Sequence, residues 1–209
     1  MPGGRQPPTF TTKDKAFMKL LLKDIVEIQI GYQARGRIEP NPAGTFRIIQ
    51  AKDFDHHNEL MIEMVYKIDV ERDPEKYLVH AGDVLFVSRG FHNYATAIQL
   101  PLENTLASNT FYILRVDARK ILPGYLAWSI NQAQDQLRGM TQAQNIPLVP
   151  KAAFERMEID LPVLSVQHTV VRLMELLKRE RDLNERRAEL IQAACIHAAG
   201  QDKERTETR

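Results

Sequence analysis

The sequence lacks several patterns whose absence excludes whole classes of protein. Its single cysteine, Cys195, allows neither an intrachain disulfide nor a thiolate metal cluster. No run of about 18 apolar residues occurs, so we expect no membrane span. Residues 1–11 lack the apolar core of a signal peptide, which favours a cytoplasmic location.

The sequence also lacks the patterns of common catalytic sites. It has no G-x-S-x-G nucleophile motif, no glycine-rich phosphate loop and no motif for binding S-adenosylmethionine. Cys195 has only His197 nearby as a candidate base, and residues two apart on a helix face different directions. We therefore expect no catalytic residue, no cofactor and no metal site.

Charge is nearly balanced, with a formal net charge of +1, but its distribution is uneven. The stretch 53–75 is acidic, and Lys67 and Arg72 are its only lysine and arginine. The stretch before it, 31–52, sets Arg35, Arg37, Arg47 and Lys52 against Glu39. A protein that meets phosphates on one face can be acidic on another, although a normally mixed surface is the alternative.

The hydrophobic pattern predicts an α+β domain of short elements. Short helices are expected at 13–22 and at 123–140, where Pro123 suits a first helical turn. The glycines and prolines of 33–44 predict a loop. Strands are expected at 46–49, 62–70, 84–87, 95–100, 110–116 and 157–162, and the wholly apolar 84–87 is expected to be buried.

The stretch 165–199 contains neither proline nor glycine and predicts one helix about 50 Å long. Ser165 suits its N-cap and Gly200 its C-terminal stop. A seam at heptad spacing is formed by Leu176, Leu183 and Leu190, with Leu173 and Ala194 at the alternate positions. Because 178–187 is nearly all charged, we favour a projecting arm that pairs with another helix over a helix packed on its own domain.

Three segments resemble, in the same order, motifs of the type I restriction–modification specificity subunits. LKDIVEIQIGY at 22–32 is similar to the opening of their target-recognition domain, AGDVLFVSRG at 81–90 to their "gDilfsrrG" segment, and IDLPVLSVQ at 159–167 to their hinge before a long helix. Residues 124–128 and 146–150 resemble two intervening motifs. Val163 replaces a usual second proline and Lys23 a usual glycine. The resemblance covers residues 20–195.

The resemblance implies a globular target-recognition domain with a small mixed or antiparallel sheet and short helices, followed by one long coiled-coil-type helix. The expected divisions are a flexible tail at 1–12, the recognition domain at 13–163, a helical spacer at 164–199 and a disordered tail at 200–209. The implied role is non-catalytic recognition of double-stranded DNA, with methylation and cleavage supplied by methyltransferase and restriction subunits.

Full-length members of that family carry two recognition domains and two spacers, whereas this sequence has room for one of each and shows no internal repeat. We therefore expect either a half-subunit that forms a homodimer through its helix or a piece of a longer protein. A homodimer would present two identical readers to two inverted half-sites at a fixed spacing.

Polar side chains in loops are the natural candidates for reading base edges, since arginine pairs with guanine and asparagine with adenine. The candidate DNA contacts are Arg35, Arg37, Lys52, Arg89, Asn93, Tyr94, Asn109 and Arg138. For each, the alternative is a solvated surface position or a turn-forming hydrogen bond. Arg89 has the further alternative of anchoring its turn through an ion pair.

Two other functions remain open at this point. The segment from Asp53 to Glu59 carries the residue types that hold Mg²⁺ in nucleases, but its adjacent histidines point in different directions, so we favour a polar loop. The long helix would also suit a coiled-coil adaptor that binds another protein.

Overall fold

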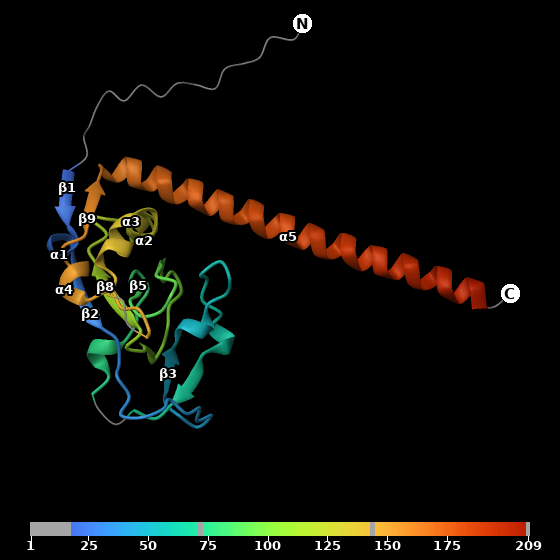
Figure 1. The fold of residues 1–209 in the computed structure, drawn as a ribbon, viewed down its shortest axis with the longest axis horizontal. Helices are drawn as coiled ribbons and strands as arrows, with labels where there is room; N and C mark the ends of the chain where they lie inside the picture. The colour runs from blue at the N-terminus through green and yellow to red at the C-terminus, as the bar shows by residue number, and fades with distance from the viewer. Residues whose placement is uncertain (1–17, 71–72, 143–144, 208–209) are drawn as a thin grey trace, which may run out of the picture. The chain divides into compact units, whose positions relative to one another are not determined.

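A computed structural model describes the backbone of residues 18–70, 73–142 and 145–207, and the side chains up to His197 (Figure 1). The chain divides into two compact units, Met1–Gln167 and His168–Arg209. The first unit is built from short strands and short helices, and the second is helical throughout its described part. This is the α+β class that the sequence predicts. No helix in the described part of the chain has the length and apolar content needed to cross a membrane.

The central sheet of the first unit has four antiparallel strands in the order β2-β8-β5-β6. Their bounds are β2 Val26–Ile30, β8 Phe111–Val116, β5 Val84–Val87 and β6 Ala95–Ala97. All four residues of β5 are buried, as their continuous apolar run predicts for a strand that is covered on both faces. The core lies against this sheet and includes Phe54, Leu85, Phe111 and Ile113.

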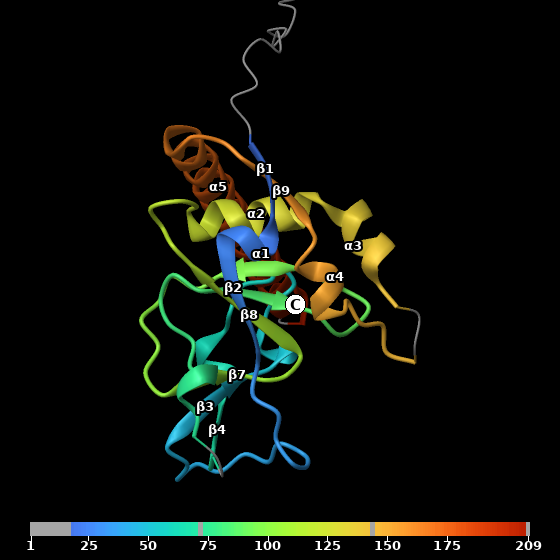
Figure 2. The ribbon, with the colours of Figure 1, turned by 90° about the vertical axis from the view of Figure 1, so that its left-hand side faces the viewer.

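A second sheet is mixed, with β3 Phe46–Ile49 between β4 Tyr66–Ile68 and β7 Thr105–Ala107. β3 pairs antiparallel with β4 and parallel with β7. A third, two-stranded sheet joins β1 Met18–Leu21 to β9 Glu158–Leu161. In Figure 2, β3, β4 and β7 lie at one end of the unit, whereas β1, β9 and the helix α2 lie at the other.

Four short α-helices complete the unit: α1 Leu22–Ile25, α2 Pro123–Gln132, α3 Gln134–Met140 and α4 Lys151–Phe154. Three 3-10 helices, η1 Ala51–Asp53, η2 Ile62–Met64 and η3 Glu75–Tyr77, lie in its described connections. α2 packs on β5 and β6, with Leu126 and Ile130 fully buried. The Asn131 side-chain amide accepts from the backbone N–H of Ala95 and donates to its carbonyl, both at 2.8 Å, along the outer edge of β6.

Several predicted elements differ from the structure. Met18–Leu21 is strand β1 rather than part of a helix at 13–22, because β9 supplies a strand partner from the far end of the unit, and residues 13–17 lie outside the described part. The predicted helix 123–140 is two helices separated at Ala133, where ψ is 39°. The Asn131 carbonyl there accepts from the Gln134 side chain. Only Tyr66–Ile68 and Ala95–Ala97 of the predicted strands 62–70 and 95–100 are strand.

The long helix α5 runs from Leu164 to Glu207. It starts one residue before the predicted N-cap Ser165, because the Val163 carbonyl accepts from the N–H groups of Val166 and Gln167. It also continues through Gly200, which was predicted to end it. A glycine inside a helix costs only about 1 kcal/mol, and the residues that follow it, with the sequence QDKERTE, are mostly good helix formers.

Four residues of the motif segments hold the first unit together, and Gln167 is the first of them. Its side chain is fully buried, yet every polar atom of it is paired. The Oε1 atom accepts from the Leu122 N–H at 2.8 Å, and Nε2 donates to the carbonyls of Pro162 at 2.9 Å and Lys120 at 3.2 Å. Leu122 is the N-cap of α2, so Gln167 joins the segment after β9 to the start of α2.

The turn before β5 depends on Gly82 and Asp83. Gly82 has φ +94°, a backbone conformation that a side chain disfavours. The buried Asp83 carboxylate accepts from the His80 N–H at 2.7 Å and forms an ion pair with Arg115, whose guanidinium also donates to the Leu78 carbonyl at 2.5 Å. Burial raises the pKa of Asp83, and the hydrogen bond from His80 and the charge of Arg115 partly offset that rise.

Gly31 allows two segments to approach closely. Its N–H donates to the Phe111 carbonyl at 3.0 Å, and the next residue, Tyr32, donates to the Ala107 carbonyl at 2.7 Å. A Cβ at Gly31 would lie 2.6 Å from that Ala107 oxygen and would overlap the Ser108 carbonyl. The buried Tyr32 ring packs edge-on against Tyr77, with ring centroids 5.4 Å apart.

We predict that Gln167→Leu destabilises the first unit. Leucine fills a similar volume but leaves the Leu122 N–H and two carbonyls without this partner, and a buried group left unpaired costs about 1–3 kcal/mol. Urea unfolding followed by circular dichroism measures the loss. Gln132→Leu, at an exposed glutamine at the end of α2, is the matched control and should leave the midpoint nearly unchanged. Equal stability of the two variants would contradict this role of Gln167.

We also predict that Gly31→Ala lowers the free energy of unfolding by at least about 2 kcal/mol, because the three nearest atoms that the new methyl group would meet all belong to the backbone and cannot rotate away. Gly139→Ala is the control, since a Cβ there meets no atom within 4 Å and Gly139 lies inside α3. Alanine should be neutral or slightly stabilising at that helical position. Thermal unfolding of both variants tests the contrast.

Candidate functional site

The first hollow on the surface of the first unit collects basic and polar side chains from three segments. It has a volume of about 530 Å³ and is lined by Gly36, Arg37, Ile38, Glu39, Pro40, Gln50, Lys52 and Tyr66. The residues 36–40 come from the predicted loop, Gln50 and Lys52 follow β3, and Tyr66 begins β4. The Lys52 ammonium lies 3.5 Å from the centre of the Tyr66 ring, a cation–π contact.

A tight turn after β3 presents Lys52 to this hollow. The Gln50 N–H donates to the Asp53 carboxylate at 2.8 Å, and the Asp53 N–H donates to the Gln50 carbonyl at 3.0 Å. Asp53 is buried, and burial raises its pKa, although the hydrogen bond from Gln50 and the charge of Lys52 oppose that shift. The Gln50 Nε2 atom is buried and finds no hydrogen-bond partner among the described residues. It is a donor that a ligand in the hollow could satisfy.

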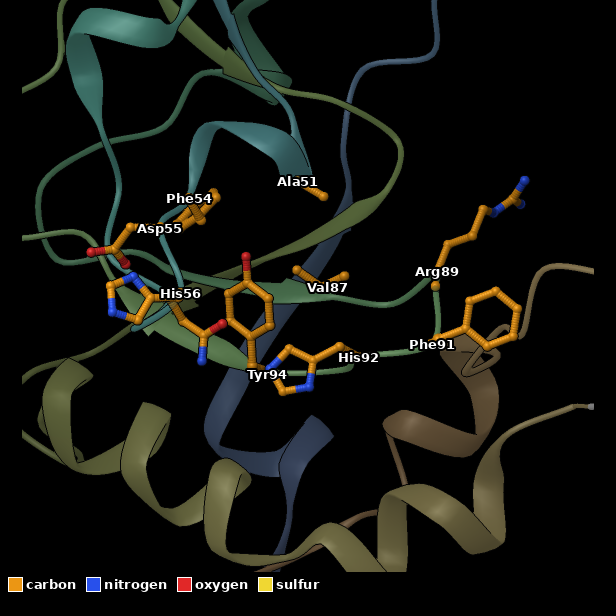
Figure 3. Close-up of a pocket in the computed structure, with 11 residues that line it drawn as sticks. Ala51, Phe54, Asp55, His56, Val87, Arg89, Phe91, His92 and Tyr94 are labelled. Carbon is orange, nitrogen blue, oxygen red and sulfur yellow. The ribbon is translucent and has the colours of Figure 1, made fainter.

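The second hollow lies on the other side of η1, between the segment 51–58 and the loop 88–94 (Figure 3). Its volume is about 430 Å³, and its lining is rich in rings, including Phe54, Phe91 and Tyr94. Phe54 and Tyr94 meet edge-on with centroids 5.7 Å apart. Burial, with a smaller contribution from Asp55, raises the pKa of Tyr94, so its hydroxyl stays protonated and can donate a hydrogen bond.

The structure places four of the predicted DNA contacts at these two hollows. Arg37 and Lys52 line the first hollow, and Arg89 and Tyr94 line the second. Ala51 and Lys52 are consecutive residues of η1 that line different hollows, so η1 forms a wall between them. Arg37, Lys52 and Arg89 are exposed, whereas Tyr94 is 7% exposed, which leaves little of its ring to meet a ligand.

The other four predicted contacts lie outside the two linings. Arg35 is exposed on the same loop as Arg37, and Arg138 is exposed on α3, 3.3 Å from Asp135. The half-buried Asn93 donates its amide to the Val87 carbonyl at 2.9 Å, which is the turn-forming alternative considered for it. Asn109 is half-buried in the turn between β7 and β8. All eight residues stay predictions as DNA contacts.

Sequence reasoning did not select Gln50, Tyr66, Phe91 and His92, which also line the hollows. Gln50 directly follows the predicted strand 46–49, and Tyr66 lies inside the predicted strand 62–70. The strand ending at Ile49 was a usable signal, because polar residues just after a strand tend to face a ligand. Phe91 and His92 lie in the loop from which Arg89, Asn93 and Tyr94 are the predicted contacts.

Two carboxylates of the segment from Asp53 to Glu59, those of Asp53 and Asp55, accept hydrogen bonds from the backbone. Asp55 accepts from the N–H groups of Glu59 at 2.8 Å and His57 at 2.9 Å. Burial raises the pKa of Asp55, but these hydrogen bonds outweigh it and the net pKa is lowered. Asp53 caps the turn after β3. Both groups therefore shape the loop, which is what the polar-loop interpretation expects.

The second unit exposes the predicted leucine seam. Leu173, Leu176, Leu183, Leu190 and Ala194 are all exposed along α5. Arg186 pairs with Glu189 at 3.0 Å, one turn along the helix surface. Leucines at heptad spacing are the pattern that helices use to pair, so pairing through this row stays a prediction.

Comparison with solved structures shows the same fold in specificity subunits. The S subunit from M. genitalium has a TM-score of 0.57 and 9% identity over 82% of this chain and 41% of its own. The HsdS subunit from Thermoanaerobacter tengcongensis has a TM-score of 0.60 and 19% identity over 84% and 45%. A structure addressing complex assembly and conformational transition of the type I R-M system gives 0.61 and 18% over 84% and 46%.

The chain thus spans less than half the length of these three structures. No curated protein matches it significantly in sequence. The family model described as the type I restriction modification DNA specificity domain, in contrast, matches residues 15–193, which is most of the chain. The chain therefore belongs to the family of type I restriction–modification DNA specificity domains.

Proposed function

We propose that this chain recognises DNA sequence as the specificity component of a type I restriction–modification system. The family match over residues 15–193 carries the proposal, because it includes both the first unit and the seam of α5 up to Leu190. In this role the chain is not an enzyme. A methyltransferase subunit and a restriction subunit act on the DNA that it selects, and the location is the cytoplasm.

The first hollow is the part of the surface whose chemistry best fits a base or a phosphate. Arg37 offers a planar fork of donors for guanine, and the Gln50 amide can pair with adenine. Lys52 adds a positive charge that suits a phosphate group. The unpaired Gln50 donor supports this use, since a buried donor without a partner is costly unless something bound in the hollow satisfies it.

The leucine seam of α5 supports pairing of two helices, either between two copies of this chain or with a helix of a longer partner. Two copies would place two identical first units on two inverted half-sites, with the spacing fixed by the paired helices. The coiled-coil adaptor alternative uses the same seam but gives the two hollows no role. DNA binding by the first unit therefore separates the two functions.

We expect the purified chain, with its methyltransferase partner, to shift a duplex selected from a random bipartite pool. Affinity should fall steeply with salt, because each phosphate contact releases counterions. Lys52→Ala should reduce the slope of log K against log salt by about one, the value for one lost phosphate contact. Arg37→Ala should relax the base preference at one position of the site. Electrophoretic mobility shift at several salt concentrations measures both effects.

Lys120→Ala is the matched control for that experiment, since Lys120 is an exposed lysine of the first unit outside both hollows. It should leave the salt slope unchanged. Salt-independent binding, or failure to bind any duplex in the pool, would contradict DNA recognition. If the Lys120 variant changed the slope as much as the Lys52 variant, that result would contradict DNA contact at the first hollow.

We expect replacement of Leu176, Leu183 and Leu190 by Asp to convert a helix-paired species to a monomer, because three charges in the seam remove its apolar contact. Light scattering coupled to size exclusion measures the mass. Lys178→Asp with Gln192→Asp is the control, since these positions lie opposite the seam. An unchanged mass in the seam variant would contradict pairing through α5.

A further inference from the structure

The loop 88–94 between β5 and β6 presents an aromatic side chain to solvent. Phe91 is 87% exposed, the highest value among the large hydrophobic side chains of the described residues. The loop itself is anchored, because the Ser88 hydroxyl donates to the Thr110 carbonyl at 3.0 Å and the Asn93 amide donates to Val87 at 2.9 Å. In Figure 3 the Phe91 ring lies on the outer side of the loop near Arg89, away from the rings of Tyr94 and Phe54.

A second loop is held beside the first. The Gly90 N–H donates to the Pro147 carbonyl at 2.9 Å, and the Val149 N–H donates to the Ser88 carbonyl at 2.8 Å. Arg89 and Leu148 form an antiparallel bridge, and continuing this register by two residues places Ile146 opposite Phe91. Ile146 is 55% exposed. The two joined loops therefore present two apolar side chains at neighbouring positions.

Both loops belong to stretches of sequence without carboxylates. No Asp or Glu occurs between Asp83 and Glu103, and none between Asp135 and Glu155. Arg89, Arg138 and Lys151 are the lysines and arginines of these two stretches. This charge pattern suits a polyanion and contrasts with the acidic stretch 53–75 of the same unit.

An exposed phenylalanine on an anchored loop cannot fold back onto the core, so its apolar surface stays in water until something covers it. Proteins that bind the minor groove insert apolar side chains of this kind between base pairs, with cationic side chains beside them on the phosphates. Phe91 with Arg89 two residues away matches that arrangement in both chemistry and rigidity.

We infer that Phe91 is a wedge residue that inserts between two base pairs of the bound duplex and partly unstacks them, with Ile146 beside it against the groove. The inference rests on the proposed function and extends it, because it assigns to this loop a distortion of the DNA rather than a hydrogen bond to a base edge. Selectivity would then include a preference for an easily unstacked pyrimidine–purine step at that position.

The test uses residues 1–209 together and the duplex selected from the random pool, with 2-aminopurine placed at each position in turn. Wild-type protein should raise the fluorescence at one step several-fold, because unstacking relieves quenching of the probe. Phe91→Ala should abolish that rise and weaken binding by about tenfold or more, with an unchanged salt slope, since the ring meets no phosphate. Phe91→Trp should keep both the rise and the affinity.

Met18→Ala is the matched control, since Met18 is 62% exposed on β1 and lies outside the two loops. It should bind and unstack the duplex as wild-type protein does. Equal thermal stability of all variants shows that the exposed side chains are not needed for folding.

The outcomes distinguish failure of DNA recognition from failure of the wedge role of Phe91. Failure of the wild-type chain to bind any duplex overturns the proposed function and this inference with it. Normal binding with no fluorescent rise at any position, or with Phe91→Ala equal to wild type, overturns the wedge alone. Loss of methyltransferase assembly by Phe91→Ala with DNA binding intact also overturns it, and assigns the loop to a protein contact.

Discussion

Three hydrogen bonds of one buried side-chain amide connect distant parts of the first unit. Gln167 pairs with Leu122 and Lys120, which precede α2, and with Pro162, which follows β9. α2 in turn packs on β5 and β6, the strands whose connecting loop carries Arg89 and Phe91. The position of the loop 88–94 therefore depends on a residue at the start of the long helix. A neutral amide suits this place because it both donates and accepts without the cost of burying a charge.

The residues that made the fold predictable stand at positions that few other residue types could occupy. Gly31 permits an approach that any Cβ would block, Gly82 adopts a positive φ, and Asp83 is a buried carboxylate paired with Arg115. Together with Gln167 they lie in the three motif segments that resembled the family. The buried strand β5 and the long charged helix α5 were equally predictable, since the burial or exposure of each follows from the residues of a single segment.

The rest depended on contacts between distant segments. β1 is a strand only because β9 pairs with it, and the break at Ala133 accompanies a side-chain hydrogen bond from Gln134. The candidate site was predicted in part: Arg37 and Lys52 meet in one hollow, but Gln50, just after β3, and Tyr66, at the start of β4, complete it. Tyr94 looked like a loop residue, yet packing against Phe54 buries its ring. A single sequence shows which residue types lie in loops. Which of those loop residues come together in space depends on how the strands pair.

The Asn131 amide has a consequence for the behaviour of the protein in solution. β6 ends its sheet, and the free backbone groups along an edge strand are a template on which another chain can add a strand. By occupying both the N–H and the carbonyl of Ala95, one side chain of α2 removes the pairing point at the first residue of a three-residue edge. The sheet is thereby partly protected from growth into aggregates at the strand that follows the loop 88–94, which leaves that loop free to differ in sequence without creating a self-associating surface.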